Sequence, residues 1–150
     1  MKKLAVFSFV LLAVVVCYQS GTALAKHYEE EAAKKPLMSY LKGHETGKAE
    51  YMKAAFHTEG KLMYMRDGKF TTIEFADYIG RMRGKPAADE ADRKRYIESV
   101  DVSGDAAVGK IILDYPGARF VDYMTLLKID GEWKIVNKAF YIERKKTDKE

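Results

Sequence analysis

Cysteine is almost absent from this 150-residue chain, which has a single one, Cys17. This excludes an internal disulfide framework and any zinc site that needs several cysteines. The sequence also lacks a glycine-rich phosphate loop and a nucleophile-elbow motif. The three histidines, His27, His44 and His57, form no i, i+4 pair on a helix. We therefore expect neither a metal site nor a bound cofactor.

A concentrated basic segment is missing as well. The formal net charge is only +4, and the lysines and arginines are scattered among acidic residues. Nucleic-acid-binding proteins usually present a concentrated basic face. We therefore expect no nucleic-acid partner.

The N-terminus has the pattern of a signal peptide. Two lysines precede an apolar run, Leu4 to Val16, and Ala23-Leu24-Ala25 supplies the small-x-small motif of a cleavage site. The run is shorter than the roughly 20 residues that a membrane span needs. The pattern predicts that residues 1–25 are removed after Ala25, which would lower the net charge from +4 to +2.

The expected product is therefore exported, periplasmic or secreted, with no cysteine and no stable membrane span after processing. A retained N-terminal anchor is the alternative. A lipoprotein is a weaker alternative, because Val16 stands before Cys17 where lipid attachment prefers a small residue. The predicted organisation is a signal peptide at 1–25, one domain at 26–143 and a charged tail at 144–150.

Helical patterns come first in the expected domain. Residues 28–41 combine strong helix formers with early acids and later lysines, although Pro36 either kinks this helix or marks its first turn. Residues 48–56 show the same spacing of apolar side chains. After a small hairpin at 61–73, which turns at Asp67-Gly68, a third short helix is expected.

Four strands follow, at 95–102, 106–114, 119–129 and 132–143, separated by turn signals that include Asp130-Gly131. Helices followed by an antiparallel meander predict an α+β fold, with N-terminal helices packed on a curved antiparallel sheet. Two-residue turns fix the register if no bulge intervenes, so we expect Tyr123 opposite Lys138 and Met124 opposite Asn137.

Both faces of the predicted sheet are apolar. The first face holds Ile111, Leu113, Phe120, Asp122, Met124, Leu126, Trp133, Ile135, Asn137 and Tyr141, and the second holds Val108, Lys110, Ile112, Val121, Tyr123, Thr125, Leu127, Val136, Lys138 and Phe140. The helices suffice to cover one face only. We therefore expect an identical subunit on the other face, in a homodimer.

Three segments resemble the nuclear transport factor 2-like superfamily. The run DYMTLLKIDGEWKIVNKAFY resembles its closing hairpin, YLKGHETGKAEYMKAAFHTEGKL its first two helices, and RYIESVDVSGDAAVGKIILDYPG its middle strands. Within that superfamily the chain is most similar to the subfamily described as putative lumazine-binding. The resemblance implies a cone-shaped, cystatin-like roll around a long N-terminal helix, with frequent dimerisation through the outer sheet face.

Asp122 is the main candidate site residue, because a carboxylate on the helix-covered face must be paired, become neutral or face a wet cavity. It either bonds a local hydroxyl or amide, or lines a pocket. If the chain is an enzyme, Asp122 and His57 are the expected catalytic residues, in line with acid–base chemistry in catalytic relatives. The expected ligand-binding residues are Tyr51, Tyr64, Tyr78, Met82, Tyr96, Asp122, Met124 and Asn137.

Three functions are compatible with this sequence. The first is a non-catalytic domain that binds a small apolar or aromatic molecule, because no complete catalytic set accompanies the expected hollow. The second is a dehydratase- or isomerase-type enzyme that uses Asp122 and His57. The third is a structural or interaction domain that acts through its sheet face.

Overall fold

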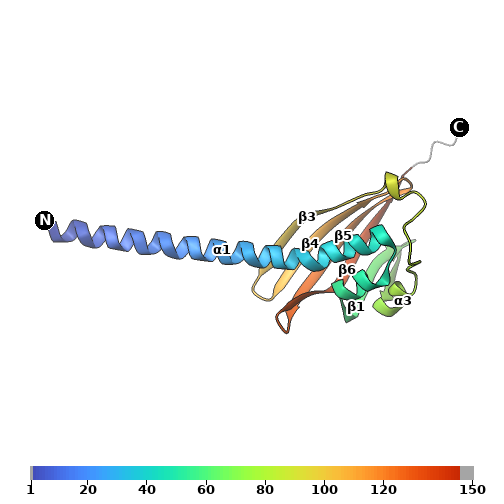
Figure 1. Cartoon of the computed structure of the whole chain (residues 1–150), viewed down its shortest axis with the longest axis horizontal. Helices are drawn as coiled ribbons and strands as arrows, with labels where there is room; N and C mark the ends of the chain where they lie inside the picture. The colour runs from blue at the N-terminus through green and yellow to red at the C-terminus, as the bar shows by residue number, and fades with distance from the viewer. Residues whose placement is uncertain (1, 146–150) are drawn as a thin grey trace.

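The computed structural model describes the backbone of residues 2–145 and the side chains of residues 24–145. Helices precede most of the strands, as predicted for an α+β fold (Figure 1). The elements are α1 (Lys2–Thr46), α2 (Ala49–Ala55), β1 (Phe56–Arg66), β2 (Lys69–Glu74), α3 (Phe75–Ile79), a 3₁₀ turn η1 (Glu90–Asp92), β3 (Lys94–Ser103), β4 (Ala106–Asp114), β5 (Ala118–Ile129) and β6 (Glu132–Arg144).

Helix α1 is a single element that continues through Pro36. Its C-terminal part lies along the sheet, whereas its N-terminal part extends beyond the sheet (Figure 1). No helix among the described residues is long and apolar enough to cross a membrane. Cleavage after Ala25 stays a prediction, and most of the charged tail, residues 146–150, lies outside the described residues.

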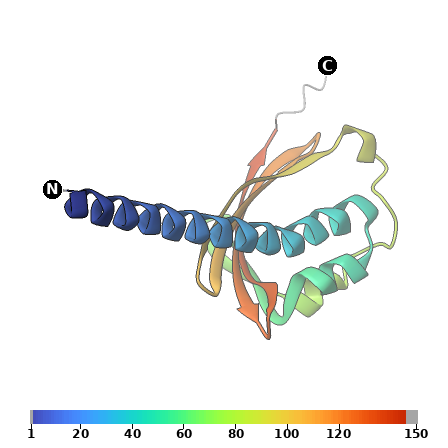
Figure 2. The same ribbon diagram turned by 60° about the vertical axis from the view of Figure 1, so that its left-hand side comes forward.

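The six strands form one curved sheet in the order β2-β1-β6-β5-β4-β3. All neighbours are antiparallel except β1 and β6, which run parallel, so the sheet is mixed. Helix α1 contacts β3, β4 and β6, while α3 contacts β1 and β2. Figure 2 shows the sheet bending around the C-terminal part of α1.

Both predicted Asp-Gly turns are present. Asp67 and Gly68 have φ angles of 51° and 75°, and Asp130 and Gly131 have φ angles of 52° and 83°. Positive φ at both central residues is the signature of the tight hairpin turn that matches strand twist. These turns join β1 to β2 and β5 to β6.

The core lies between α1 and the inner face of the sheet. Ala33, Leu37 and Tyr40 are fully buried and share one face of α1. Gly109 of β4 allows this close approach, because a Cβ atom added there would lie 2.6 Å from Leu37 Cδ1. Because Gly109 has no side chain, α1 can pack closer to β4 than any other residue at this position would allow.

The predicted β5–β6 register is correct near the turn and wrong beyond it. Ile129 pairs with Glu132, but Thr125 pairs with Asn137 while Leu126 pairs with Ile135. Val136 is the extra residue of a β-bulge. Compared with the regular register that the turn predicts, every side chain of β6 after Val136 therefore lies on the opposite face of the sheet. Tyr123 therefore lies opposite Ala139, not opposite Lys138.

The bulge exchanges the predicted faces of the last part of β6. Lys138 and Phe140, expected on the outer face, turn toward the helices. Asn137 and Tyr141, expected on the inner face, turn away from them, and Tyr141 is 65% exposed. The prediction for β5 holds, since Asp122 is buried and Tyr123 is exposed.

The outer face of the sheet is rich in apolar side chains. Val108, Tyr123, Leu127 and Tyr141 are exposed there, on strands β4, β5 and β6. An exposed apolar patch of this kind is typical of a protein–protein interface. The homodimer stays a prediction that this face supports.

Light scattering coupled to size exclusion tests the homodimer. At micromolar concentration we expect a dimer mass for the wild type, because burial of the outer face removes apolar area from water. Tyr123→Glu should give a monomer, whereas Met38→Glu, at an exposed site on α1, should leave the dimer intact. A monomeric wild type would refute this arrangement.

Candidate functional site

A buried ion pair lies at the centre of the inner face. Asp122 of β5 is 0% exposed and Lys138 of β6 is 3% exposed. Lys138 Nζ donates to Asp122 Oδ2 at 2.9 Å and to the Tyr40 hydroxyl of α1 at 2.7 Å. The Tyr40 hydroxyl donates to the same Asp122 Oδ2 at 2.6 Å. One carboxylate oxygen therefore joins a helix to two strands.

Burial changes the acid–base properties of this cluster. Desolvation lowers the pKa of Lys138, and the neighbouring Asp122 carboxylate opposes that shift without cancelling it. Desolvation raises the pKa of Tyr40 well above its usual value, and the Asp122 charge adds to this effect. Tyr40 is therefore a protonated hydroxyl at neutral pH and can donate to Asp122.

A partly buried histidine, His44, lies one helical turn beyond Tyr40 on α1. Its Nε2 is 2.9 Å from the Tyr78 hydroxyl and its Nδ1 is 3.3 Å from the Tyr115 hydroxyl. Desolvation holds the pKa of His44 well below 6.5, and the positive charges of Lys138, Arg95 and Arg93 act in the same direction. The imidazole is therefore neutral, so one of its nitrogens accepts a hydrogen bond and the other donates one.

The two tyrosines that contact His44 have raised pKa values, mainly because burial disfavours the phenolate. Tyr115 also accepts a hydrogen bond from Arg95 Nε at 3.4 Å. Arg95 in turn forms a bidentate ion pair with Glu90. This polar chain reaches from the His44 imidazole toward η1.

An inner cavity of about 230 Å³ adjoins these groups. Its lining comes from two helices, five strands and two connecting segments: His44, Leu62, Tyr64, Ile73, Tyr78, Arg81, Leu113, Tyr115, Phe120, Lys138, Phe140 and Ile142. Most of the lining is aromatic or aliphatic, while His44, Tyr78, Tyr115 and Lys138 supply convergent polar groups. Such a lining is typical of small-molecule sites.

The structure brings only some of the sequence-predicted ligand residues to this cavity. Tyr64 and Tyr78 line it. Asp122 does not line the cavity but bonds to Lys138, which does. Met124 is fully buried in the core and Met82 packs against the core, so neither lines the cavity.

The remaining predicted residues lie elsewhere. Tyr96 is exposed on β3, Asn137 lies on the outer side of the bulge, and Tyr51 belongs to α2, where its carbonyl accepts a hydrogen bond from Ser39. His57 lies at the start of β1, where its Nδ1 accepts the Glu59 N–H. It does not line the inner cavity, and the partners of Asp122 are Tyr40 and Lys138.

The sequence interpretation missed Tyr40, His44, Tyr115 and Lys138 as site residues. Ala33, Leu37, Tyr40 and His44 follow the helical 4-3-4 spacing, so the periodicity of α1 could have placed both polar rings on its buried face. Lys138 gave no comparable signal, because its facing depends on the bulge.

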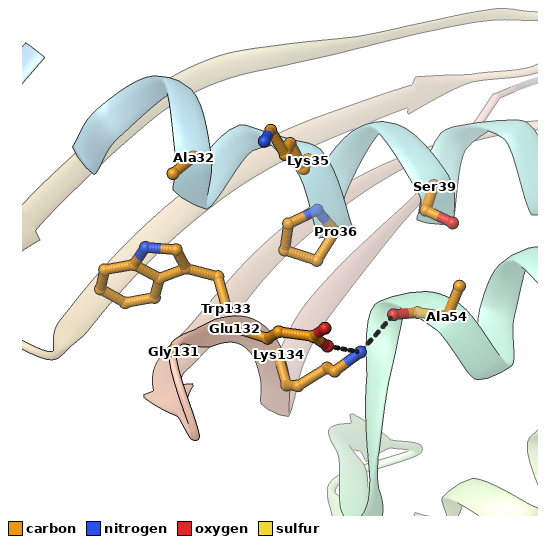
Figure 3. A pocket seen from close by; sticks show the side chains of 9 residues that line it. All are labelled: Ala32, Lys35, Pro36, Ser39, Ala54, Gly131, Glu132, Trp133 and Lys134. Atoms are coloured by element: carbon orange, nitrogen blue, oxygen red, sulfur yellow. Dashed lines mark hydrogen bonds and ion pairs between the residues drawn. The ribbon is translucent and has the colours of Figure 1, made fainter. Parts of the chain in front are cut away.

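A second hollow, of about 360 Å³, lies at the surface between α1, α2 and the β5–β6 turn (Figure 3). Two of its charged groups contact each other: Lys134 Nζ lies 3.1 Å from Glu132 and also donates to the Ala54 carbonyl at 3.2 Å. Trp133, beneath α1, donates from its indole N–H to Glu29 at 3.1 Å. Lys134, Glu132 and Trp133 thus bond to neighbouring parts of the protein, whereas the inner cavity has an aromatic lining with several polar groups and is the better candidate site.

Comparison with known proteins agrees with this architecture. Residues 28–141 match the family described as putative lumazine-binding. The chain belongs to this family. The match supports a small-molecule-binding domain with the nuclear transport factor 2-like fold, as the resemblance predicted.

The structure is similar to that of an NTF2-like protein of unknown function from Shewanella baltica, with 26% identity, a TM-score of 0.69, and coverage of 77% of this chain and 94% of that one. A domain with a cystatin-like fold from Nostoc punctiforme shares the fold at 14% identity, with a TM-score of 0.56 and 80% coverage of both chains. The curated "Aldolase FrzH" of a Cladobotryum species is 24% identical over 123 residues, which cover 79% of this chain and 97% of that protein.

The Asp122–Lys138 pair predicts a non-additive mutational cycle. Lys138→Met leaves a buried carboxylate without its cation and should cost about 3–5 kcal/mol of unfolding free energy. Asp122→Leu combined with Lys138→Met removes both charges and should be more stable than Lys138→Met alone. Urea unfolding followed by Trp133 fluorescence measures both values. A double variant no more stable than Lys138→Met would contradict the pairing.

His44 predicts a specific loss of stability in acid. Its folded-state pKa lies below its unfolded value of 6.5, so the unfolded chain binds the extra proton first as the pH falls. Below pH 6.5 this group should remove up to about 1.4 kcal/mol of stability per pH unit, until the folded-state pKa is reached. His44→Gln should lose that slope, while the control His57→Gln should keep it. Urea unfolding from pH 7 to pH 4 measures the slopes, and equal slopes would refute the assignment.

Proposed function

We propose that this domain binds a small ring compound in the inner cavity, with the apolar part of the ligand against Tyr64, Phe120 and Phe140. The combination of an aromatic lining with the polar groups of His44, Tyr78 and Lys138 supports this proposal most directly. The polar end of the ligand would accept from Lys138 or exchange hydrogen bonds with Tyr78. The family match supports the same kind of function.

The size of the cavity limits the ligand. Pockets for drug-sized molecules usually measure about 300–1,000 Å³, whereas a cavity of about 150 Å³ can hold benzene. The inner cavity, at about 230 Å³, therefore favours a compound of one or two rings. A sterol-sized ligand would require the sheet and α1 to separate.

Carbonyl chemistry is a second candidate function. The similarity to Aldolase FrzH, over nearly the whole of that protein, supports it together with the buried amine of Lys138. An enzyme built on Asp122 and His57 has less support, because His57 is outside the cavity lining. A purely structural role has less support too, since the inner face retains an unfilled space.

Thermal-shift and calorimetric titration with one-ring aromatics, pteridines, flavins and sterols tests the binding proposal. We expect stabilisation by one- or two-ring compounds, which adds about 2.7 kcal/mol to the unfolding free energy at a ligand concentration 100 times Kd. Sterols should give no shift.

Neighbouring residues on β6 provide a matched pair of variants. Ile142 lines the cavity and Tyr141 is exposed on the opposite face. Ile142→Trp should fill the cavity and abolish binding, while Tyr141→Trp should bind normally. Failure of every one- and two-ring compound to bind the wild type would overturn the proposal, as would binding that Ile142→Trp leaves unchanged.

A further inference from the structure

We propose that Lys138 is a nucleophilic amine that forms an imine with a small aldehyde or ketone held in the inner cavity. This inference rests on the proposed function, because it names the chemical class of the ligand and the atom that captures it. It also assigns Lys138 a covalent role in addition to its ion pair with Asp122.

Lys138 is the only buried lysine among residues 24–145, and it lines the cavity. Aromatic rings surround its side chain, with Nζ 4.4 Å from the centroid of Phe140, 5.2 Å from that of Tyr40 and 5.9 Å from that of Tyr78. An apolar enclosure favours the neutral amine, which is the form that attacks carbonyl carbons. The lowered pKa of Lys138 has the same cause.

The hydrogen-bond partners of Lys138 also suit the neutral amine that forms when its ammonium group loses a proton. Its Nζ has two oxygen partners, Asp122 Oδ2 and the Tyr40 hydroxyl, and an aromatic ring, that of Phe140, lies next to it. An ammonium group has three N–H donors, whereas a neutral amine has two donors and one lone pair. Once the ammonium of Lys138 has passed a proton to Asp122, the two oxygens satisfy both remaining N–H groups and the lone pair is free for a carbonyl carbon.

Asp122 can take up the proton that the amine must lose. Its Oδ2 already accepts from Lys138, and its Oδ1 is buried with no hydrogen-bond partner among the described residues. A buried carboxylate oxygen without a partner keeps its full capacity to accept a proton or to bind the water that is released. The Tyr40 hydroxyl, 2.7 Å from Nζ, is a second group for proton exchange.

The reaction balances without an oxidant or a reductant. The ammonium proton passes to Asp122, and the nitrogen lone pair then forms a C–N bond as the carbonyl π electrons move to oxygen. The former carbonyl oxygen takes up two protons, one from the attacking nitrogen and one returned by Asp122; the C–O bond then breaks and water leaves while the nitrogen lone pair forms the C=N bond. The products are a protonated imine on Lys138 and one molecule of water, with the overall charge unchanged.

Reductive trapping tests this inference on the full chain. Benzaldehyde is the probe, because a single ring fits the cavity, and sodium cyanoborohydride reduces the imine to a stable benzylamine. Intact mass and peptide mapping should find one benzyl group, on Lys138. At pH 7 we expect Lys138 to be labelled faster than Lys110, because burial lowers the pKa of Lys138 whereas the ion pair with Glu98 raises the pKa of Lys110.

Variants separate a nucleophile from a purely structural lysine. Lys138→Arg keeps the positive charge and should lose the fast label, while Ile142→Trp should slow labelling by blocking the cavity. The titratable groups facing Lys138 are Asp122 from β5, Tyr40 and His44 from α1 and Tyr78 from α3. Asp122→Asn removes the only carboxylate among them and should move the pH profile of labelling at Lys138 to lower pH, which a structural role would not do.

Benzyl alcohol distinguishes the two proposals, because it has the same ring and no carbonyl group. If benzyl alcohol binds in the thermal-shift assay but benzaldehyde labels only surface lysines, the imine is refuted and the binding proposal stands. If no one- or two-ring compound binds, benzyl alcohol and benzaldehyde included, and Lys138 is not labelled, both are refuted. Fast labelling of Lys138 that Ile142→Trp does not slow would also overturn capture within the cavity.

Discussion

A buried charge must find an opposite charge and hydrogen bonds, and the inner face of this protein is built around one such pair. Asp122 and Lys138 lie on neighbouring strands with almost no exposure to solvent. Tyr40 completes the cluster from the helix that covers the sheet. The cluster therefore fixes the position of α1 relative to β5 and β6, because any shift would leave a buried polar atom without a partner.

The β-bulge at Val136 makes this pair possible. Without it, Lys138 would face outward and Asn137 would lie opposite Met124, which would leave the Asp122 carboxylate without a cation. Bulges often re-aim side chains next to functional sites. Here the bulge at Val136 turns three side chains of β6 toward the inner cavity, those of Lys138, Phe140 and Ile142. The same event leaves Tyr141 on the outer face, beside the apolar patch of Val108 and Tyr123.

The inner cavity is lined by two kinds of side chain, apolar ones and a few polar ones. The aromatic and aliphatic side chains exclude water, and this desolvation keeps His44 neutral and Tyr40 and Tyr78 protonated. Groups in these states can exchange hydrogen bonds with a neutral polar ligand without adding a further buried charge. The site therefore suits a ligand with a carbonyl or hydroxyl group better than one with an isolated ion at its buried end.

The sequence by itself determined the class of fold, the hairpin turns and the identity of the buried carboxylate. Asp-Gly pairs and alternating apolar residues are local signals, and each strand carries its own pattern. Only the tertiary structure decided the partner of Asp122, the facing of Lys138 and the meeting of His44 with Tyr78 and Tyr115. No local sequence pattern marks the bulge, yet it moves every later side chain of β6 to the other face of the sheet. Contacts between distant segments, in turn, depend on how strands and helices pack in three dimensions.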